Sequence, residues 1–573
     1  MQPPALALGV LLVLSLLLRL WGIRQGLPYS YNIDEDTHFV PIAVGFFGHG
    51  LNPHYFLNPP AYTYLLFGVF RLWFGGTEAV RSAYATDPTA VFVVARVVAA
   101  LLSTAAVWLT YLAGKRFFGR GPGLLAAGVL GVGFLPVFYS HLALDDAPAL
   151  APVALALYGS ARVLRRGRTL DYVLAGAGVG LAAATKYTAG IALLCLLGAF
   201  AADAARRSPR ETLRGLAVAL LIALAGFVLA NPYAVLDSGD FLRGLSQQAT
   251  LAGGGGAPAK LGLSHESGLL YYLWTFTWGL GWVPALAGLA GALLLVLRRH
   301  AALALTLLPG PVVFLIFMGQ EQRFFGRWLM PIFPIVAILA GYGVAEAVRW
   351  VGRGRRNPTI LVSAIAAAAL VGQSLVADIR NDGVLSRPDT RNLARAWMLR
   401  HIPAGSKVVI EPVVPDNWVQ EPHPPGTPAV QRWVRYPTWQ TNLGRDGRPL
   451  PAGRHRQVTV EEYERSLFPS LASNYPARGY CWVLTGSFQS GRAFAQPAAV
   501  PGAIAYYAAL ARRGRLVHHV SPYAAGAHPV RFNFDWSIDY YPDEYRLPGP
   551  DIRIYHLNGP RCGGRRSPRS PAS

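Results

Sequence analysis

Residues 31–64 read YNIDEDTHFVPIAVGFFGHGLNPHYFLNPPAYTY and follow the first long apolar run of the chain. The stretch opens with three consecutive acids, Asp34, Glu35 and Asp36, and closes with the turn Asn58-Pro59-Pro60 ahead of an aromatic segment. Carboxylates beside a membrane are costly unless they face water, a cation or a reacting group. We therefore expect this stretch to lie at a membrane surface and to contribute to a reactive site.

The composition is that of a membrane protein. Of the 573 residues, 53% are hydrophobic and 14% are charged, which is unusual for a soluble chain. Apolar runs long enough to cross a bilayer recur between residues 5 and 377 and then stop. The formal charge of +22 is compatible with nucleic acid binding, but the arginines fall largely in short loops between apolar runs. The sequence predicts a polytopic α-helical membrane protein that binds a lipid bilayer and no nucleic acid.

The apolar runs and the basic loops predict about eleven transmembrane helices. Residues 5–23 form the first crossing, which we expect to be retained, and the first outer loop follows at residues 26–88. Residues 172–202 lie between two basic loops, so an even number of crossings must connect these loops, with a turn near Lys186. Two crossings in about 31 residues are short, so this pair must be broken or lie where the bilayer is thin.

The region beyond the apolar runs is expected to form a separate domain. We divide the chain into a transmembrane domain at residues 1–377, an extracytoplasmic α/β domain at 378–558 and a disordered basic tail at 559–573. Strand-like runs in the second domain occur at residues 407–411, 481–485, 515–520 and 551–556. In the first outer loop, residues 39–47 and 61–74 are short and aromatic, which suits helices that lie in the interface plane.

The three cysteines indicate little on their own. Cys195 lies in an apolar run and is expected to be a packing residue. Cys481 and Cys562 lie in the polar third, where a disulfide between them is possible if that region is outside the cytoplasm. The sequence leaves this pairing open.

The predicted topology places four polar groups at one membrane face. They are the acids of residues 34–36, the pair Asp145-Asp146, Lys186 and the segment 321–327. A carboxylate can take the proton from an acceptor hydroxyl, and a lysine or arginine can neutralise a departing phosphate. Each group alone could be a solvated helix end or an interfacial anchor. Their convergence favours group transfer from a lipid-linked phosphate.

A divalent cation is a further possibility. The histidines of the chain together with its acids could bind one, but no HExxH or paired CxxC spacing supports zinc. Oxygen ligation of Mg²⁺, Mn²⁺ or Ca²⁺ is chemically reasonable. The sequence leaves the metal content open.

Several motifs together resemble the family 39-type glycosyltransferases of the GT-C superfamily, which include protein O-mannosyltransferases and the lipid A aminoarabinose transferase. The resemblance covers most of residues 1–377. It rests on DEDTHF at 34–39, GLNPHYF at 50–56, NPPAY at 58–62, HLALDDAP at 141–148, TKYT at 185–188, EQRF at 321–324 and LMP at 329–331. The motif with the double proline is the most specific of these.

The resemblance implies an inverting transfer from a polyprenyl-phosphate sugar donor to a hydroxyl of a protein, lipid or envelope glycan. It implies an enzyme of the plasma (inner) membrane with Asp34 as the general base, and Glu35 and Asp146 as further catalytic candidates. Substrate contacts are then expected from Asp145, Lys186, Glu321, Arg323, Arg327, His54, Asn58 and Tyr62. Several relatives carry a lysine where this chain has Asn58, which argues against aminoarabinose transfer and shifts phosphate neutralisation to Lys186 or the arginines.

Two other classes of function compete with this interpretation. A lipid or lipid-linked sugar transporter, such as a flippase, would carry charges near the midplane and often shows inverted repeats, whereas here the charges gather at one face and no repeat is visible. A silent scaffold that displays the outer domain is the third reading. An enzyme fits the grouped acids and cations best.

Overall fold

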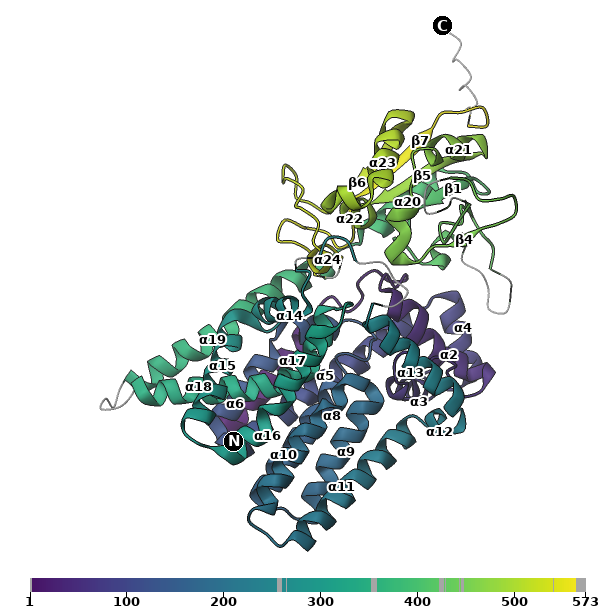
Figure 1. Ribbon diagram of the computed structural model, residues 1–573. Coiled ribbons are helices and arrows are strands. Elements are labelled where there is room, and N and C mark those ends of the chain that lie inside the picture. Colours follow the sequence, from purple (N-terminus) through teal and green to yellow (C-terminus); the bar gives the residue numbers. More distant parts are fainter. Residues whose placement is uncertain are drawn as a thin grey trace.

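The structure is a computed structural model that describes residues 3–562, except 255–259, 264, 352–357, 422–426, 428, 443, 445–447 and 539. A large helical bundle makes up the first part of the chain, and a smaller α/β region lies over one end of it (Figure 1). Most of the predicted basic tail, part of the arginine-rich loop before α19 and part of the glycine run near residue 255 lie outside the described residues.

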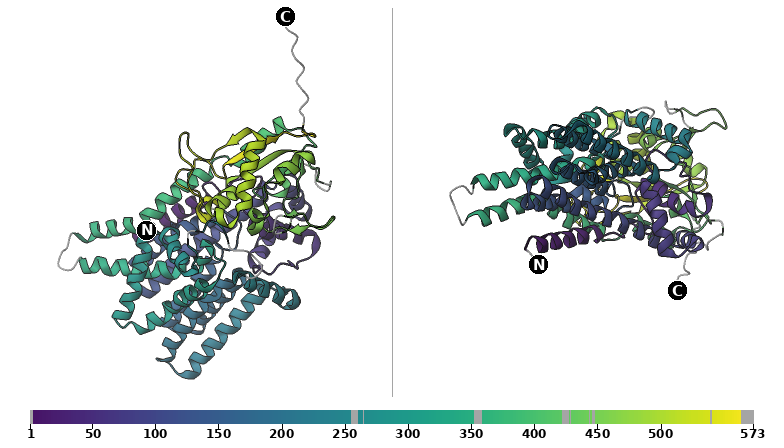
Figure 2. Two further views of the ribbon diagram at one scale, coloured as in Figure 1. Left: turned by 45° about the horizontal axis from the view of Figure 1, so that its top comes forward. Right: turned by 90° about the horizontal axis from the view of Figure 1, so that it is seen from below.

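The bundle is built from apolar helices joined by short polar turns. Its elements are α1 (Pro3–Leu20), η1 (Glu35–Phe39), α2 (Val40–His49), α3 (Ala61–Phe74), α4 (Thr77–Thr86), α5 (Thr89–Phe118), α6 (Arg120–Gly131), α7 (Phe134–Tyr139), α8 (Leu150–Arg165), α9 (Thr169–Thr185), η2 (Tyr187–Ala192), α10 (Leu193–Ala204), α11 (Pro209–Ala230), α12 (Tyr233–Leu236), α13 (Ser238–Ala252), α14 (Gly268–Phe276), η3 (Thr277–Gly281), α15 (Trp282–Leu297), α16 (Ala301–Leu307), α17 (Pro309–Gln320), η4 (Gly326–Ile332), α18 (Phe333–Val351) and α19 (Pro358–Leu385). Figures 1 and 2 show α18 and α19 projecting side by side from one edge of the bundle.

Seven helical segments in the described residues are long and apolar enough to cross a membrane. They are Thr89–Phe118, Tyr187–Ala204, Pro209–Ala230, Gly268–Leu297, Ala301–Gln320, Gly326–Val351 and Leu361–His401. The first of these and α9, a shorter apolar helix, both pack against α8. The chain is thus a multi-pass membrane protein.

The predicted break at Lys186 is present. Helix α9 ends at Thr185, and the 3₁₀ helix η2 starts at Tyr187 and leads into α10. The two basic loops on either side of this pair contact each other, because Nη1 of Arg207 donates to the carbonyl oxygen of Arg166 at 3.1 Å. The chain therefore leaves one end of the bundle and returns to the same end, as the parity of the basic loops predicted.

Small residues allow α9 to pack closely against its neighbours. A Cβ atom added at Gly176 would lie 2.2 Å from the carbonyl oxygen of Ala219 in α11. At Gly180 the corresponding distance to the oxygen of Ala223 would be 2.1 Å. Close backbone approach through small residues is a common way for helices to associate in membranes. This packing fixes the position of α9 along the bundle axis, and with it the position of Lys186, which directly follows α9.

The first outer loop contains helices in both segments where the sequence predicted them. Helices α2 and α3 cover residues 40–49 and 61–74. On α3, Leu72 is 86% exposed and Trp73 is 72% exposed, while Phe70 on the same helix is buried. An apolar edge of this kind, with an aromatic residue at its end, suits contact with the membrane interface.

The C-terminal region is a mixed α/β unit, as predicted. Its helices are α20 (Thr390–His401), η5 (Asp416–Val419), η6 (Val460–Ser466), α21 (Leu471–Ala477), α22 (Ser487–Ala495), η7 (Pro497–Ala499), α23 (Pro501–Arg513) and α24 (Phe534–Ile538). Its strands are β1 (Lys407–Ile410), β2 (Val434–Arg435), β3 (Gln440–Thr441), β4 (Arg456–Gln457), β5 (Tyr480–Gly486), β6 (Gly514–Val520) and β7 (Ile552–Leu557). The main sheet has the order β2-β1-β5-β7-β6, with β1 parallel to β2 and β5, and with β7 antiparallel to β5 and β6.

A disulfide closes this region. The bond joins Cys481 in β5 to Cys562, which follows β7, and so settles the pairing that the sequence left open. Cys195 is a free, buried thiol in α10, in agreement with a packing role.

A carboxyl group is buried where β1 and β5 end. Glu411 follows β1 and has no exposed surface; its Oε2 accepts from the backbone N–H of Gly486 at 2.8 Å, and its Oε1 from the hydroxyl of Tyr507 at 2.7 Å. Burial raises the pKa of Glu411 to about 8, although both hydrogen bonds oppose this shift. The neutral acid is therefore the form that this site favours.

We expect the C-terminal region to lose stability as the pH rises from about 5 to about 8. Over this range the unfolded chain carries an ionised Glu411, whose ordinary pKa is about 4.3, while the folded chain keeps the proton, so the folded state binds more protons and is weakened by their removal. The melting temperature should fall by at least about 5 °C, measured by limited proteolysis of this region during heating. Glu411→Gln should flatten the dependence, whereas Asp543→Asn, at an 85% exposed side chain, should leave it unchanged.

Candidate active site at the junction of the two regions

Five of the predicted site residues form one ionic network. Nη2 of Arg327 lies 2.8 Å from Oδ2 of Asp34, and Nε of the same guanidinium lies 3.5 Å from Oδ2 of Asp146. Nζ of Lys186 lies 2.7 Å from Oδ1 of Asp146 and 3.4 Å from Oδ1 of Asp145. Arg327 thus joins the first outer loop to the acidic pair, and Lys186 completes the cluster from the break between α9 and η2.

The network is enclosed by protein except at its Asp34 end. Asp145 and Asp146 are each 2% exposed and Lys186 is 7% exposed, while the Asp34 side chain is 29% exposed. Burial raises the pKa of Asp145, opposed mainly by Lys186. For Lys186, burial alone would lower the pKa, but Asp145 and Asp146 outweigh it and raise the pKa above its ordinary value. The ammonium stays charged, and Asp34 is the carboxylate of the network that solvent or a substrate can reach most readily.

Glu35 lies beside Asp34 in the sequence but belongs to a different set of contacts. Its side chain has no exposed surface and receives two bonds from Arg96, from Nε at 2.8 Å and from Nη2 at 2.7 Å. The hydroxyl of Ser30 donates to Oε2 at 2.6 Å, and the backbone N–H of Ala143 donates to Oε1 at 2.7 Å. Both oxygens are therefore occupied, and Glu35 ties the first outer loop to α5 and to the loop that carries Asp145 and Asp146. Its burial and these contacts favour a positioning role for Glu35, and the catalytic role inferred from the sequence stays a prediction.

Two aromatic side chains of the first outer loop, His38 and Tyr55, lie close enough to Asp34 to feel its charge. The ring of His38 stacks on that of Tyr55 with a centroid distance of 4.2 Å, and Nδ2 of Asn58 donates to the Tyr55 hydroxyl at 2.9 Å. Burial raises the pKa of Asp36 to about 7, and the negative charge of the neighbouring Glu35 is the next largest cause of this shift. Asn58 thus contacts Tyr55, a residue that the sequence reasoning did not single out, and its contact with substrate stays a prediction.

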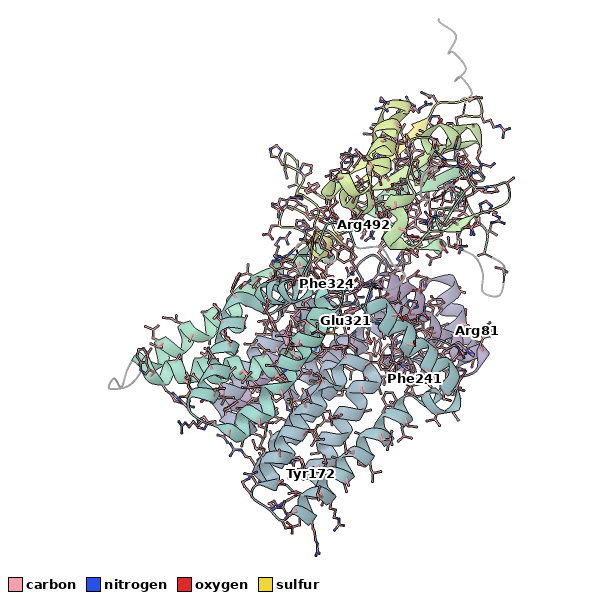
Figure 3. All side chains as sticks on the ribbon, in the orientation of Figure 1. Arg81, Tyr172, Phe241, Glu321, Phe324 and Arg492 are labelled. Atoms are coloured by element: carbon pink, nitrogen blue, oxygen red, sulfur yellow. A yellow bond between two sulfur atoms is a disulfide. The ribbon has the colours of Figure 1, made fainter. Side chains whose placement is uncertain are left out.

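The segment 321–327 supplies two arginines that lie near one aromatic ring. The Cζ atom of Arg327 lies 4.3 Å from the Phe325 ring centroid, and that of Arg323 lies 5.4 Å from the same centroid. Glu321 lies further back, at the end of α17, where burial raises the pKa of its carboxyl. Figure 3 places Glu321 and Phe324 at the junction between the bundle and the α/β region, and Tyr172 near the opposite end of the bundle.

Lys260 is a further cation of this junction that the sequence reasoning missed. Its Nζ donates to the carbonyl oxygen of Phe324 at 3.0 Å and lies 3.1 Å from the ring centroid of Phe325. The one available signal was the rarity of lysine, since the chain contains only four. Arg96 was also missed, because an arginine within an apolar run carries no sign of its distant partner.

Two predicted contact residues lie apart from the network. Tyr62 is buried in the hydrophobic core, and its hydroxyl donates to the carbonyl oxygen of Ala95 at 2.8 Å. His54 is exposed and pairs with Asp240, with 3.3 Å between Nδ1 and Oδ2. Among the described residues, neither side chain forms a hydrogen bond or an ion pair with Asp34.

In the described part of the chain, His54 lies in a cluster of three side chains that are close enough together to bind a metal ion. The ligand atoms of His54, Asp237 and Asp240 all lie within 4.8 Å of one another. Asp237 also accepts from Asn52, and Asp240 pairs with Arg243, so both carboxylates already have protein partners. The acids of the central network are likewise balanced by Arg327 and Lys186. The divalent cation considered from the sequence stays a prediction.

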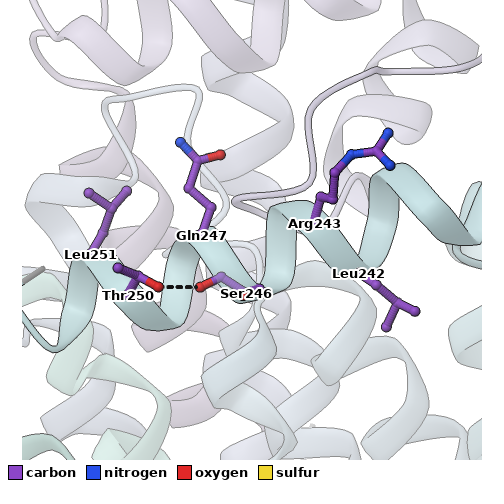
Figure 4. Close-up of a pocket in the computed structure, with 6 residues that line it drawn as sticks. All are labelled: Leu242, Arg243, Ser246, Gln247, Thr250 and Leu251. Carbon is purple, nitrogen blue, oxygen red and sulfur yellow. Dashed lines mark hydrogen bonds between the residues drawn. The ribbon is translucent and has the colours of Figure 1, made fainter. Parts of the chain in front are cut away.

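An open groove runs along α13, separate from this network. It encloses about 560 Å³ and is lined by Leu242, Arg243, Ser246, Gln247, Thr250 and Leu251 (Figure 4). The hydroxyl of Thr250 donates to the carbonyl oxygen of Ser246 at 2.9 Å, which keeps that side chain against the helix. The groove holds none of the predicted site residues.

The chemistry available to the central network follows from its charges. Asp34 offers a partly exposed carboxylate that can accept a proton. Arg327, with the neighbouring Arg323 and Lys260, supplies cations that can bind phosphate oxygens. The buried pair Asp145 and Asp146 holds Lys186 and Arg327 in place. The arrangement suits displacement of a phosphate by a deprotonated hydroxyl.

Comparison with known proteins agrees with the resemblance noted in the sequence. The family model described as dolichyl-phosphate-mannose-protein mannosyltransferase matches residues 89–230, an interval that contains Asp145, Asp146 and Lys186. No curated protein matches the chain by sequence.

Several solved structures are similar to the chain. One is ArnT from Cupriavidus metallidurans bound to undecaprenyl phosphate, with 17% identity over 69% of this chain and 72% of that chain and a TM-score of 0.44. Another is the Archaeoglobus fulgidus oligosaccharyltransferase in its apo form, with 14% identity over 90% of this chain and 73% of that chain and a TM-score of 0.48. A third is the S. cerevisiae protein O-mannosyltransferase Pmt1-Pmt2 complex bound to the sugar donor, with 19% identity over 42% of this chain and 34% of that chain and a TM-score of 0.33.

The family match confirms the recognition made from the sequence motifs. Over residues 89–230 the chain is similar to the mannosyltransferase family that this model describes. The matched interval does not include the first outer loop, so it leaves the assignment of Asp34 to the geometry.

Proposed function

We propose that the chain is an inverting glycosyltransferase that moves a sugar from a polyprenyl-phosphate donor to an acceptor hydroxyl at the extracytoplasmic membrane face. The observation that carries the proposal is the bridge of Arg327 between Asp34 and Asp146, with Lys186 behind it. A general base and a phosphate-binding cation thereby lie within one hydrogen bond of each other. The matched family model, whose description names a dolichyl-phosphate sugar, supports the donor class.

The proposed step is a single displacement. Asp34 takes the proton of the acceptor hydroxyl, and the oxygen forms a bond to the anomeric carbon on the face opposite the phosphate. The bond between that carbon and the phosphate oxygen breaks, and its electron pair leaves with the polyprenyl phosphate. Arg327 moves from Asp34 to the donor phosphate when the donor binds, which frees the carboxylate to act as base. Asp146, which Lys186 also pairs with, holds the guanidinium in reach of both positions.

The proposal is tested by the product. Purified protein in detergent is given a panel of polyprenyl-phosphate pentoses and hexoses together with membrane extracts as acceptors, and the product masses are measured. Transfer of one sugar unit with release of the polyprenyl phosphate is expected. If no donor of the panel reacts while reconstituted protein moves lipid between leaflets, the chain is a transporter and the proposal is wrong.

We further propose about eleven crossings, with the C-terminal region outside the cytoplasm. Adding α1, α6, α8 and α9 to the seven long candidates gives this number. Two observations support the orientation: the basic loops gather at the end of the bundle away from the α/β region, and that region contains a disulfide. The units at residues 1–377 and 378–558 then correspond to a catalytic membrane domain and an extracytoplasmic domain.

Thiol labelling in intact cells tests this topology. Cysteines introduced at Arg166 and Arg210 are expected to be shielded from an impermeant reagent, and one at Asp543 is expected to label. The background is low because Cys195 is buried and the other two cysteines are paired. Labelling at only one of the two arginine positions would mean that residues 172–202 cross the membrane once.

A further inference from the structure

The C-terminal region reaches into the top of the helical bundle. Helix α24 lies at the junction of the two regions in Figure 1. Oδ2 of Asp535 in α24 accepts a hydrogen bond from the hydroxyl of Tyr271 in α14. Two residues after α24, the hydroxyl of Tyr540 donates to that of Tyr139 at 3.0 Å. This segment is therefore held against α7 and α14 by bonds between buried side chains.

Two polar atoms at this contact have no hydrogen-bond partner among the described residues. One is Oδ1 of Asp535, whose side chain is 1% exposed, and the other is Nε1 of Trp278, which is 7% exposed. Buried carboxylate oxygens and indole N–H groups are normally satisfied, because leaving them unpaired is costly. Two unsatisfied groups of opposite kind, an acceptor and a donor, point to a polar ligand that provides both.

The two residues belong to one cluster of aromatic side chains. The ring of Trp278 lies 5.2 Å from that of Trp536, the residue after Asp535, and 4.7 Å from that of Tyr540. Apolar ring faces combined with a few fixed polar groups are typical of small-molecule sites. Saccharides suit such a lining, because their C–H faces pack on aromatic rings while their hydroxyls need donors and acceptors.

The same cluster reaches the cationic part of the candidate active site through Phe534 and Phe325, whose ring centroids lie 6.0 Å apart. Nζ of Lys260 lies between two rings, 3.1 Å from the Phe325 centroid and 4.3 Å from the Phe534 centroid. Phe325 in turn lies under the guanidinium of Arg327. A phosphate is attracted to these cations and repelled by the carboxylate of Asp535, so the charges separate a phosphate position from a position for a neutral, hydroxylated ring.

We propose that Asp535 and Trp278 form the subsite for the hydroxyl groups of the transferred sugar, so that the C-terminal region supplies part of the donor site. This inference rests on the proposed function and adds the residues that select the sugar ring. Oδ1 of Asp535 accepts from one ring hydroxyl, and Nε1 of Trp278 donates to a ring oxygen. The donor phosphate lies toward Lys260 and Arg327, which leaves the anomeric carbon between the two positions.

Steady-state kinetics with the reactive donor of the panel test the subsite. Asp535→Asn keeps the shape of the side chain and removes its charge, and Trp278→Phe keeps an aromatic ring at the position while it removes the N–H. Each should raise the donor KM by about tenfold or more with kcat within about threefold, because the bond to the sugar is present both before and during the transfer. Monodeoxy versions of the same donor then identify the hydroxyl: its removal should raise the KM of the wild type about tenfold and that of Asp535→Asn hardly at all.

Two further variants separate this role from a structural one. Tyr271→Phe removes the bond to Oδ2 of Asp535 but leaves Oδ1, so it should keep the wild-type response to every monodeoxy donor. Asp543→Asn removes a carboxylate from the same segment at an 85% exposed position and should change neither constant. A wild-type KM in both Asp535→Asn and Trp278→Phe, or equal responses of wild type and Asp535→Asn to every monodeoxy donor, overturns the subsite alone and indicates that ordered water satisfies the two atoms. Absence of transfer by the wild type overturns the proposed function and the subsite together.

Discussion

Asp34→Asn is expected to lower the rate of sugar transfer by about 10³-fold while the protein folds normally. The substitution keeps the size of the side chain and its bond to Arg327, but an amide cannot take the proton of the acceptor hydroxyl. Asp34 is the most exposed carboxylate of the network, and its side chain pairs with the guanidinium of Arg327 in the described part of the chain, so little of the fold depends on its charge. The measurement is the initial rate at saturating donor and acceptor, together with the melting temperature of the purified variant.

Glu78→Gln is the matched control, because it removes one negative charge from an exposed position of the same outer loop. It should retain the wild-type rate and melting temperature. A wild-type rate for Asp34→Asn would move the general base to another residue, and Asp36 would then be the first to replace. A low melting temperature for Asp34→Asn would instead show that the Arg327 bridge is needed for folding.

Glu35→Gln is expected to act on stability rather than on the transfer step. It should destabilise the folded protein by about 3–5 kcal/mol. Arg96 is 1% exposed and would keep its charge in the interior after losing the carboxylate that pairs with both Nε and Nη2. The N–H of Ala143 and the hydroxyl of Ser30 would lose a charged acceptor at the same time. A marked fall in melting temperature and in the yield of monodisperse protein should report the change.

A double variant shows whether the ion pair is the cause. Arg96→Met alone should be as harmful as Glu35→Gln, because it leaves the carboxylate unpaired in the interior. The combination of both changes removes both charges and should recover part of the loss, so the two effects should not add. Equal losses that add fully would show that the two side chains act independently, and the pair would then not hold the loop.

These two variants also show where sequence reasoning stops. Asp34 and Glu35 are neighbours in one acidic run, and nothing in the amino-acid sequence distinguishes a general base from a structural residue. The distinction arises from local geometry. A helical segment starts at Glu35, so successive side chains point in different directions around the axis, and one carboxylate faces Arg96 while the other faces Arg327. Arg96 and Arg327 lie 61 and 293 residues away from these acids, and only the packed bundle brings them close.

The larger features of the fold could be predicted because they depend on composition. The length of the apolar runs predicts where helices cross the membrane, and the basic loops predict which helix ends lie on the same side of it. Together they predict the turn at Lys186, which the structure contains. The same apolar runs and basic loops predict that Asp145, Asp146, Lys186 and Arg327 lie at one membrane face. Side-chain contacts such as those of Tyr62 and His54 depend on the rotation of individual helices, which run length does not specify.

The order of strands in the α/β region sets a sequence of events during synthesis. Strand β7 lies between β5 and β6 in the sheet, yet it is the last of the strands to leave the ribosome. The sheet therefore cannot close, and Cys562 cannot reach Cys481, until the helices of the bundle have already been translated and inserted. Helix α24 precedes β7, so its docking onto Tyr271 is among the final steps. A nascent chain stalled before β7 would be embedded in the membrane with an unfinished outer region, which would make it a recognisable target for quality-control proteases.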